Sequence, residues 1–159
     1  MDQAVRHDSE RWLALVRRFC AGLCPVTGKT LSDEGISLPQ FNALSLLEEQ
    51  GELTMTAVAK GLGVTMGAGT SLMDNLVEQS LVERRRSTSD RRVVKVTLTP
   101  KGVDVLARSK AKLLEFWAGV LGSLNPEERS KAIQTFHEVL DRAERAKVTL
   151  HEKPVGDTE

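Results

Sequence analysis

The amino-acid sequence predicts a mainly α-helical fold with one small β-hairpin, and three observations lead to this prediction. Apolar residues recur at helical spacing over long stretches at both ends of the chain. Two short helical segments near the middle are separated by Gly63. Directly after them come two strand-like runs, 81–86 and 92–98, of which the second alternates with a period of two, and turn-forming residues join them. A chain of 159 residues is most simply a single domain with its own core.

The first predicted helix runs from Val5 to Cys24. Its apolar residues follow a helical stripe made of Trp12, Leu13, Val16, Phe19, Cys20 and Leu23. We expect Pro25 to end or kink this helix, because the residue before a proline is pushed out of the α region. Residues 26–37 are therefore interpreted as an irregular connection.

Ser37 is predicted to begin a second helix. Gln40 follows it at the spacing of a capping box, in which each residue's side chain binds the backbone N–H of the other. Pro39 lies in the first turn, where a missing N–H is tolerated. Gly51 is expected to end the helix after its buried stripe of Phe41, Leu44 and Leu47.

Two shorter helices are predicted next. The first is capped by Thr54 and ends at Gly63, and the second is capped by Thr65 and runs to about Gln79. The inward face of the second helix consists of Gly69, Leu72, Met73 and Leu76. Two short helices joined at a glycine are the signature of a helix-turn-helix.

The hairpin that follows has an arginine-rich tip. Thr99 and Pro100 then supply a helix cap and a proline at the first helical position, so a long helix begins there. Asn125 and Pro126, followed by two glutamates, open a last helix in the same way. A helix-turn-helix followed by a hairpin is a winged helix, in which the hairpin is the wing.

Charge is distributed unevenly along a chain that is neutral overall. The sequence has 22 basic and 22 acidic side chains, but residues 54–102 hold 8 basic and 4 acidic ones. A local basic patch is an electrostatic footprint for a polyanion such as nucleic acid. No apolar run approaches the roughly 20 residues that span a bilayer. The polar N-terminus is unlike a signal peptide, so we expect a cytoplasmic protein with no membrane partner.

The stretches "LTMTAVAKGLGVT" and "LMDNLVEQSLVERRRSTSDRRVVKVTLTPKG" resemble the MarR family of bacterial transcription regulators. The resemblance covers about residues 37–108. It includes Asp90, Arg91 and Arg92 at the wing and the motif Leu-Thr-Pro-Lys-Gly at 98–102. The flanking helices match the family in number and placement rather than in motif.

The resemblance implies a homodimer that binds double-stranded DNA. Residues 37–102 would form the winged helix-turn-helix, and residues 1–36 and 103–148 would form a helical dimerisation region. The wide apolar stripes on the terminal helices agree with this, because a second copy would cover them. Residues 149–159 are polar, and we expect them to form a disordered tail.

The resemblance also assigns DNA contacts. The recognition helix would enter the major groove and the wing the adjacent minor groove, so that two copies bind a pseudo-palindromic operator. Arg92 matches the wing arginine that probes the minor groove, and Asp90 matches an acidic residue that supports the wing. The predicted DNA-binding residues are Thr65, Met66, Thr70, Ser71, Asn75, Arg84, Arg85, Arg86, Arg91 and Arg92.

The recognition helix departs from the family pattern. Family members often carry arginine or lysine at the positions of Met66 and Ser71, and a bulky residue at Gly69. Here the outward face has no basic residue and carries Asp74 and Glu78. Hydroxyls, one amide and a thioether remain for base contacts. We expect the wing to carry more of the binding than usual, or the helix to become well ordered only on DNA.

Cys20 and Cys24 lie four residues apart on the first helix. One interpretation is that Cys20 packs as a small apolar side chain. The other is redox sensing, since some family members detect oxidants through a cysteine in this helix, and Arg17 and Arg18 would favour the thiolate. A spacing of four is awkward for a disulfide within a helix, so a bond between subunits is a further alternative.

No catalytic residue, metal site or cofactor is predicted. The three histidines are scattered, and the sequence lacks a glycine-rich phosphate loop and a nucleophile–histidine pair. We predict a non-enzymatic repressor whose affinity for DNA is altered by a small-molecule effector or by cysteine oxidation. Candidate residues for an effector cleft are Trp12, Phe19, Phe41, Phe116 and Trp117. The alternative is a winged-helix protein-interaction module without sequence-specific DNA binding.

Overall fold

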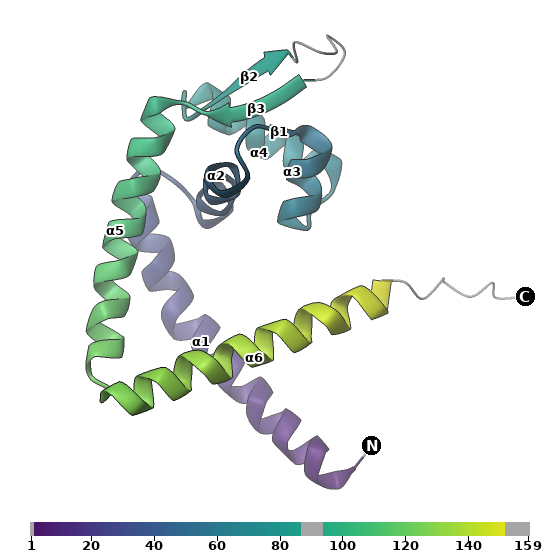
Figure 1. Cartoon of the computed structure of the whole chain (residues 1–159), viewed down its shortest axis with the longest axis vertical. Coiled ribbons are helices and arrows are strands. Elements are labelled where there is room, and N and C mark those ends of the chain that lie inside the picture. The colour runs from purple at the N-terminus through teal and green to yellow at the C-terminus, as the bar shows by residue number, and fades with distance from the viewer. Residues whose placement is uncertain (1, 87–93, 152–159) are drawn as a thin grey trace, which may run out of the picture. The chain divides into compact units, whose positions relative to one another are not determined.

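The computed structural model describes residues 2–86 and 94–151, with side chains described as far as Ala146. It divides into two compact units, Met1–Leu114 and Glu115–Glu159, which are treated separately below. The elements, labelled in Figure 1, are α1 (Gln3–Ser32), α2 (Leu38–Gln50), β1 (Leu53–Thr54), α3 (Met55–Leu62), α4 (Met66–Glu78), β2 (Val82–Arg86), β3 (Val94–Leu98), α5 (Pro100–Gly122) and α6 (Pro126–His151).

The three strands form one antiparallel sheet in the order β1-β3-β2. In the hairpin, Val82 is opposite Leu98 and Arg86 is opposite Val94. β1 pairs with the other edge of β3, with Leu53 opposite Val96. The sequence prediction missed β1, because a strand of two residues is too short to show alternation. The mainly helical fold with a small hairpin is confirmed.

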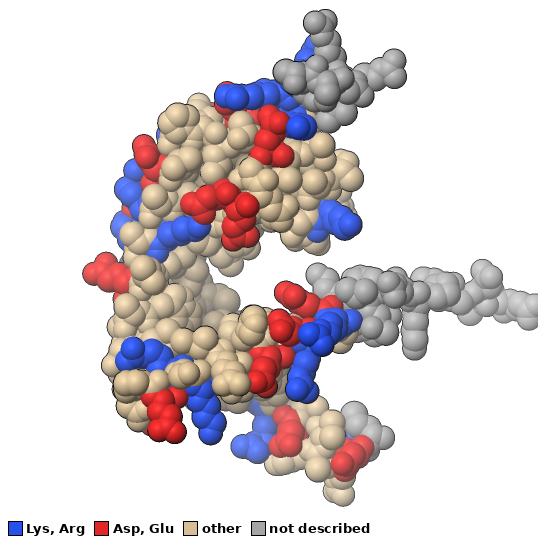
Figure 2. All heavy atoms as spheres, viewed as in Figure 1, with Lys and Arg blue, Asp and Glu red and all other residues tan. Residues whose placement is uncertain are grey.

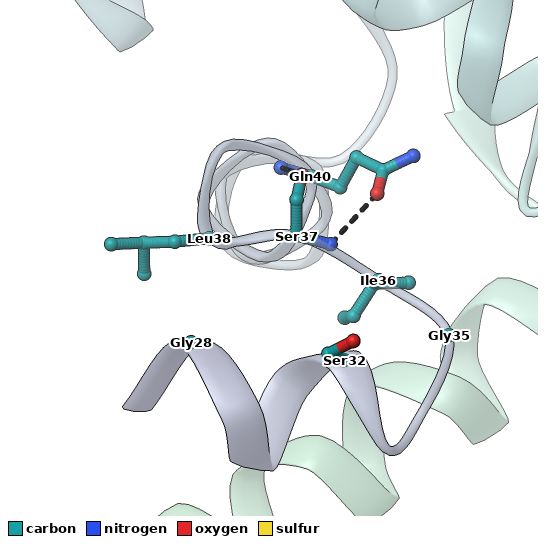
Figure 3. A pocket seen from close by; sticks show the side chains of 7 residues that line it. All are labelled: Gly28, Ser32, Gly35, Ile36, Ser37, Leu38 and Gln40. Carbon is teal, nitrogen blue, oxygen red and sulfur yellow. Dashed lines mark hydrogen bonds between the residues drawn. The ribbon is translucent and has the colours of Figure 1, made fainter. Parts of the chain in front are cut away.

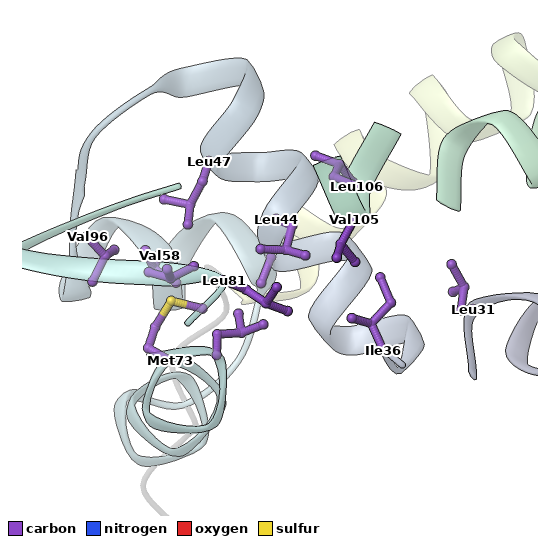
Figure 4. Close-up of a cluster of buried hydrophobic side chains, with 13 residues drawn as sticks. Leu31, Ile36, Leu44, Leu47, Val58, Met73, Leu81, Val96, Val105 and Leu106 are labelled. Carbon is purple, nitrogen blue, oxygen red and sulfur yellow. The ribbon is translucent and has the colours of Figure 1, made fainter. Parts of the chain in front are cut away.

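The core of the first unit lies between the sheet and the helices of the winged domain (Figure 4). Met73 and Leu76 of α4, Val96 of β3 and Leu106 of α5 are fully buried there. Truncating one such leucine or methionine to alanine typically costs about 2–5 kcal/mol. This packing fixes α4 against the sheet and determines which α4 side chains reach the surface.

The sequence predicted that Pro25 would end or kink the first helix at Cys24. The predicted end is wrong. α1 continues through Pro25 to Ser32, so most of the expected connection at 26–37 is helical. A proline inside a helix costs about 3 kcal/mol, because it removes one hydrogen bond and crowds the preceding turn. Burial offsets that cost, since Leu31 in the last turn is completely buried in the core. The helix then closes on Gly35 (φ 78°), and the Ile36 N–H donates to the Leu31 carbonyl.

The predicted caps of the next three helices are confirmed. The Ser37 N–H donates to Gln40 Oε1 (2.8 Å), and the Gln40 N–H donates to Ser37 Oγ (3.4 Å), which completes the capping box of α2. Thr54 caps α3 by accepting from the Ala57 N–H. Gly63 ends α3 in the left-handed conformation, which a glycine adopts without strain.

The start of α5 explains the motif at 98–102. The Thr99 hydroxyl accepts from the Gly102 N–H (3.0 Å) and donates to the Ser80 carbonyl (2.7 Å). Lys101 Nζ donates to the Gln79 carbonyl at the end of α4. A Cβ on Gly102 would lie 2.0 Å from the Leu81 carbonyl oxygen, so only glycine fits. The motif therefore joins α5 to the α4–β2 connection.

A half-buried acidic residue joins the α1–α2 turn to α5. Glu34 pairs with Arg108 (Nε to Oε2, 2.9 Å) and Lys112 (Nζ to Oε1, 2.5 Å). These hydrogen bonds, first that from Lys112 and then that from Arg108, lower the pKa of the Glu34 carboxyl below its usual range. The carboxylate therefore stays ionised at neutral pH, when both pairs stabilise the turn.

The second unit consists of the end of α5 and α6. Asn125 caps the start of α6, as predicted, and Glu128 completes a capping box with it that the sequence analysis did not identify. Arg129 donates to the carbonyls of Leu121 and Leu124 (both 3.1 Å). The predicted tail begins too early, because the helical backbone continues to His151. Residues 152–159 lie outside the described residues.

Candidate nucleic-acid interface

The turn between α3 and α4 places the two helices in close contact. Val64 N–H donates to the Ala59 carbonyl just after Gly63. Gly69 is buried, and a Cβ there would lie 3.3 Å from the Ala59 Cβ. Gly69 is therefore explained by the packing of the helix-turn-helix.

The outward face of α4 is exposed and carries no basic side chain. Met66 is 48% exposed, and Ser71 and Asn75 also face solvent. The Thr65 hydroxyl accepts from the Ala68 N–H (3.3 Å), so it caps the helix. The Thr70 hydroxyl donates to the Met66 carbonyl (2.8 Å). Met66, Ser71 and Asn75 are therefore exposed without such a hydrogen bond within the helix, whereas both threonine hydroxyls already take part in one.

The arginines of β2 lie beside this face. Alternate side chains of a strand point to opposite sides of the sheet, so Arg84 and Arg86 share one side with buried Val82, and Arg85 has the other. Arg86 is exposed, and no ion pair is found for it among the described side chains. Arg85 pairs with Glu83 on its own strand. Figure 2 shows basic and acidic side chains gathered side by side at this end of the sheet.

Arg84 has a partner that the sequence reasoning missed. Its Nη2 donates to Asp74 Oδ1 of α4 at 2.5 Å, with both side chains partly exposed. The prediction had Arg84 contact phosphates or support the wing, and it had Asp74 as an acidic departure on the groove face. The structure brings the two together, so the strand and the recognition helix are joined by an ion pair. Ten residues separate them, a spacing that no helical or strand periodicity marks.

The predicted wing-tip residues cannot be placed in this arrangement. Asp90, Arg91 and Arg92 lie outside the described residues. The strands that carry the tip are described, and Lys95 of β3 pairs with Glu52 next to β1 (3.0 Å).

Both cysteines are exposed on α1. The interpretation that Cys20 packs as a small apolar side chain is therefore not met within the described chain. The pKa of the Cys24 thiol is raised above its ordinary value, chiefly by desolvation and then by the charge and hydrogen bond of the neighbouring Cys20 thiol. Thiolate formation at Cys24 is disfavoured, which is the opposite of what a nearby arginine would produce.

A cleft of about 380 Å³ lies where α1 ends and α2 begins (Figure 3). Its lining includes Ser32, Ile36, Leu38 and Gln40 together with two glycines. The Gln40 side-chain oxygen is occupied by the Ser37 N–H. None of the aromatic residues predicted for an effector cleft lines this one.

The described residues lack a metal-ligand cluster and a membrane-spanning helix. They contain no group of three or more His, Cys, Asp and Glu side chains arranged to hold a metal ion. None of the described helices combines the length and hydropathy needed to cross a bilayer.

Comparisons with known proteins agree with this geometry. The MarR family profile matches residues 36–94. The HTH-type transcriptional repressor Rv2887 of Mycobacterium tuberculosis is 31% identical over 116 residues, 72% of this chain and 84% of that protein.

Two solved structures share the fold. The YusO protein of Bacillus subtilis superposes with a TM-score of 0.70 at 25% identity, covering 88% of this chain and 99% of that one. A variant of Staphylococcus aureus MepR bound to an oligodeoxyribonucleotide superposes with a TM-score of 0.61 at 22% identity, covering 83% and 97%.

Proposed function

Because the chain belongs to the MarR family of winged-helix transcriptional regulators, we propose that it is a repressor that binds a pseudo-palindromic operator as a homodimer. The observation that carries the proposal is the exposed face of α4 beside the arginines of β2. The repressor Rv2887 supports the sign of regulation, and the MepR variant bound to an oligodeoxyribonucleotide supports DNA binding through this fold. A regulator of this kind acts on the chromosome, so we place it in the cytoplasm.

The proposed contacts divide between helix and wing. α4 would lie in the major groove, with Met66 against a thymine methyl group and Ser71 and Asn75 on base edges or phosphates. Thr65 and Thr70 would reach the backbone, since their hydroxyl oxygens retain acceptor or donor capacity. The cationic contacts would come from the hairpin through Arg84, Arg85, Arg86, Arg91 and Arg92, with Asp90 supporting the wing.

The proposed dimer would bury apolar side chains that each unit exposes. On α1, Trp12, Leu13 and Phe19 are 44–68% exposed. On α6, Ile133 and Phe136 are each more than half exposed. Monomeric proteins rarely expose contiguous apolar surface of this kind, so residues 1–36 and 103–148 are the proposed dimerisation region.

Control of DNA affinity by a small-molecule effector is the proposed regulation, and the cleft between α1 and α2 is the candidate site on the first unit. Oxidation of Cys20 and Cys24 is the second candidate, supported by their exposure. Peroxide that releases DNA from the wild type and not from the Cys20→Ser/Cys24→Ser variant would support oxidation. Equal release from both proteins would remove it.

The test of the proposal is fluorescence anisotropy with labelled DNA from immediately upstream of the gene. The protein is titrated at two salt concentrations, with and without an unrelated competitor duplex. We expect binding that survives the competitor and weakens as salt rises, because phosphate contacts release counterions. An Arg92→Ala variant should bind the operator far more weakly while remaining dimeric. Binding that the competitor abolishes would contradict sequence recognition.

The second candidate function is a protein-interaction module. It is favoured by one observation, that α4 presents Asp74 and Glu78 and no basic residue to its surroundings. In that case the competitor duplex would remove all DNA binding, and alanine substitutions on α4 would leave the residual DNA affinity unchanged.

A further inference from the structure

Cys20 and Cys24 occupy successive turns of one continuous helix. The continuation of α1 through Pro25 is what places both of them in helical backbone, four residues apart on one side. Both side chains are exposed. Desolvation and, after it, the neighbouring Cys20 thiol raise the pKa of the Cys24 thiol, which agrees with two sulfurs near each other on this side of the helix. The pair is therefore a preformed dithiol on the helix surface.

The spacing disfavours a disulfide within the chain. Residues four apart on a helix have Cβ atoms about 5–6 Å apart. A disulfide requires Cβ atoms about 3.5–4.5 Å apart, so closing one here would distort the helix. A single larger atom that bonds both sulfurs has no such difficulty. Two sulfur bonds of about 2.3 Å, as found in thiolate–metal sites, join sulfurs up to about 4.6 Å apart.

The residues around Cys20 and Cys24 restrict which ligand the two sulfurs can bind. The whole sequence has two cysteines, and the described residues bring no further His, Cys, Asp or Glu to them as a third ligand. A structural zinc ion needs four protein ligands, so one chain does not supply its coordination. Soft sulfur ligands favour soft centres, and an organic trivalent arsenical takes two sulfurs and no more.

We propose that Cys20 and Cys24 form a binding site for trivalent organoarsenicals and related thiophilic electrophiles. In the reaction, each sulfur forms one bond to arsenic, and the arsenic–oxygen bonds break. The oxygen leaves as water with the two thiol protons. Arsenic stays trivalent, and no oxidant or reductant is consumed.

The experiment uses the full-length protein and phenylarsine oxide, followed by intact-mass spectrometry under native conditions. We expect one phenylarsenic group per chain, retained against excess glutathione and released by ethanedithiol. Cys20→Ser and Cys24→Ser should each reduce retention about 100-fold or more, because the second bond of a chelate forms at high effective concentration.

The matched control keeps two thiols at the wrong spacing. In Cys24→Ser/Thr27→Cys, the thiols lie seven residues apart on the same side of α1, about 10 Å along the axis. This variant should lose retention as the single variants do. Three results would each overturn the proposal. The single variants could retain the phenylarsenic group as well as the wild type does, one arsenic could be shared by two chains, or the thiols could react only after unfolding. The last result would mean that a partner helix covers the pair.

Discussion

The recognition helix and the strand beside it differ sharply in charge. α4 presents hydroxyls, an amide, a thioether and two carboxylates, whereas β2 carries three consecutive arginines. The two surfaces meet at the Asp74–Arg84 pair. Attraction to DNA and discrimination among DNA sequences therefore need not reside on the same element. On our account the hairpin supplies most of the affinity, and α4 supplies what selectivity the complex has.

The largest effect is expected from Gly102→Ala. Gly102 packs against Leu81 directly before β2, so this contact holds the arginine-bearing strand in place beside α4. The added methyl group would lie 2.0 Å from the Leu81 carbonyl oxygen, which is backbone and cannot move aside. We expect a loss of at least about 2–3 kcal/mol in the free energy of unfolding, the cost typical of steric overpacking. Chemical denaturation measures it. A change of less than about 0.5 kcal/mol would show that α5 starts elsewhere.

Removing two cations from β2 should produce the next largest effect. We expect Arg85→Ala/Arg86→Ala to weaken binding to any duplex by about 10- to 100-fold and to reduce the salt slope by up to about two units, one for each lost phosphate contact. Lys131→Ala/Arg142→Ala on α6 is the matched control, since it removes two exposed positive charges outside the proposed DNA interface, and size-exclusion chromatography checks that it stays dimeric. If both variants lost the same DNA affinity, the effect would come from net charge alone and not from contacts of β2.

Asp74→Asn tests the connection between the two surfaces. The substitution removes the carboxylate charge that holds Arg84. Because a partly exposed ion pair contributes about 1 kcal/mol or less, the protein should remain folded. We expect DNA affinity to rise a few-fold at low salt, with the salt slope about one unit steeper, as Arg84 turns to a phosphate. Weaker binding would instead mean that Asp74 positions Arg84 for its contact.

The smallest effect concerns the two glycines of α4. A Cβ on Gly67 meets nothing within 4 Å, whereas one on Gly69 approaches Ala59 to 3.3 Å. Gly67→Ala should therefore stabilise the protein by about 0.5–1 kcal/mol, as expected for alanine in a helix interior. Gly69→Ala should stabilise the protein less than Gly67→Ala does, or destabilise it. Thermal denaturation separates the two, and the reverse order would contradict the packing of α3 on α4.

Local signals predicted the winged domain well. The side chains of Ser37, Thr54 and Thr65 accept hydrogen bonds within three residues of themselves, so the sequence contains everything that these caps require. Pro25 misled the prediction, because its local cost is offset by the burial of Leu31, which depends on residues far along the chain. β1 was missed because its two residues show no alternation, and it is a strand only through its pairing with β3.

The candidate interface was predicted less completely than the fold. The exposed positions of α4 follow from helical periodicity, and they face outward as expected. The role of Arg84 was not foreseeable, because the pair with Asp74 depends on how β2 packs against α4. Arg91 and Arg92 at the wing tip remain predictions, as they lie outside the described residues.

The most direct test of the division between helix and hairpin compares two variants on two duplexes. Ser71→Ala/Asn75→Ala and Arg85→Ala/Arg86→Ala are each titrated against the operator and an unrelated duplex over a range of salt. We predict that the α4 variant reduces the ratio of specific to non-specific affinity and keeps the salt slope. The β2 variant should lower both affinities and flatten the slope. The account would be contradicted if the β2 variant lowered the ratio of specific to non-specific affinity. It would also be contradicted if the α4 variant flattened the salt dependence of binding.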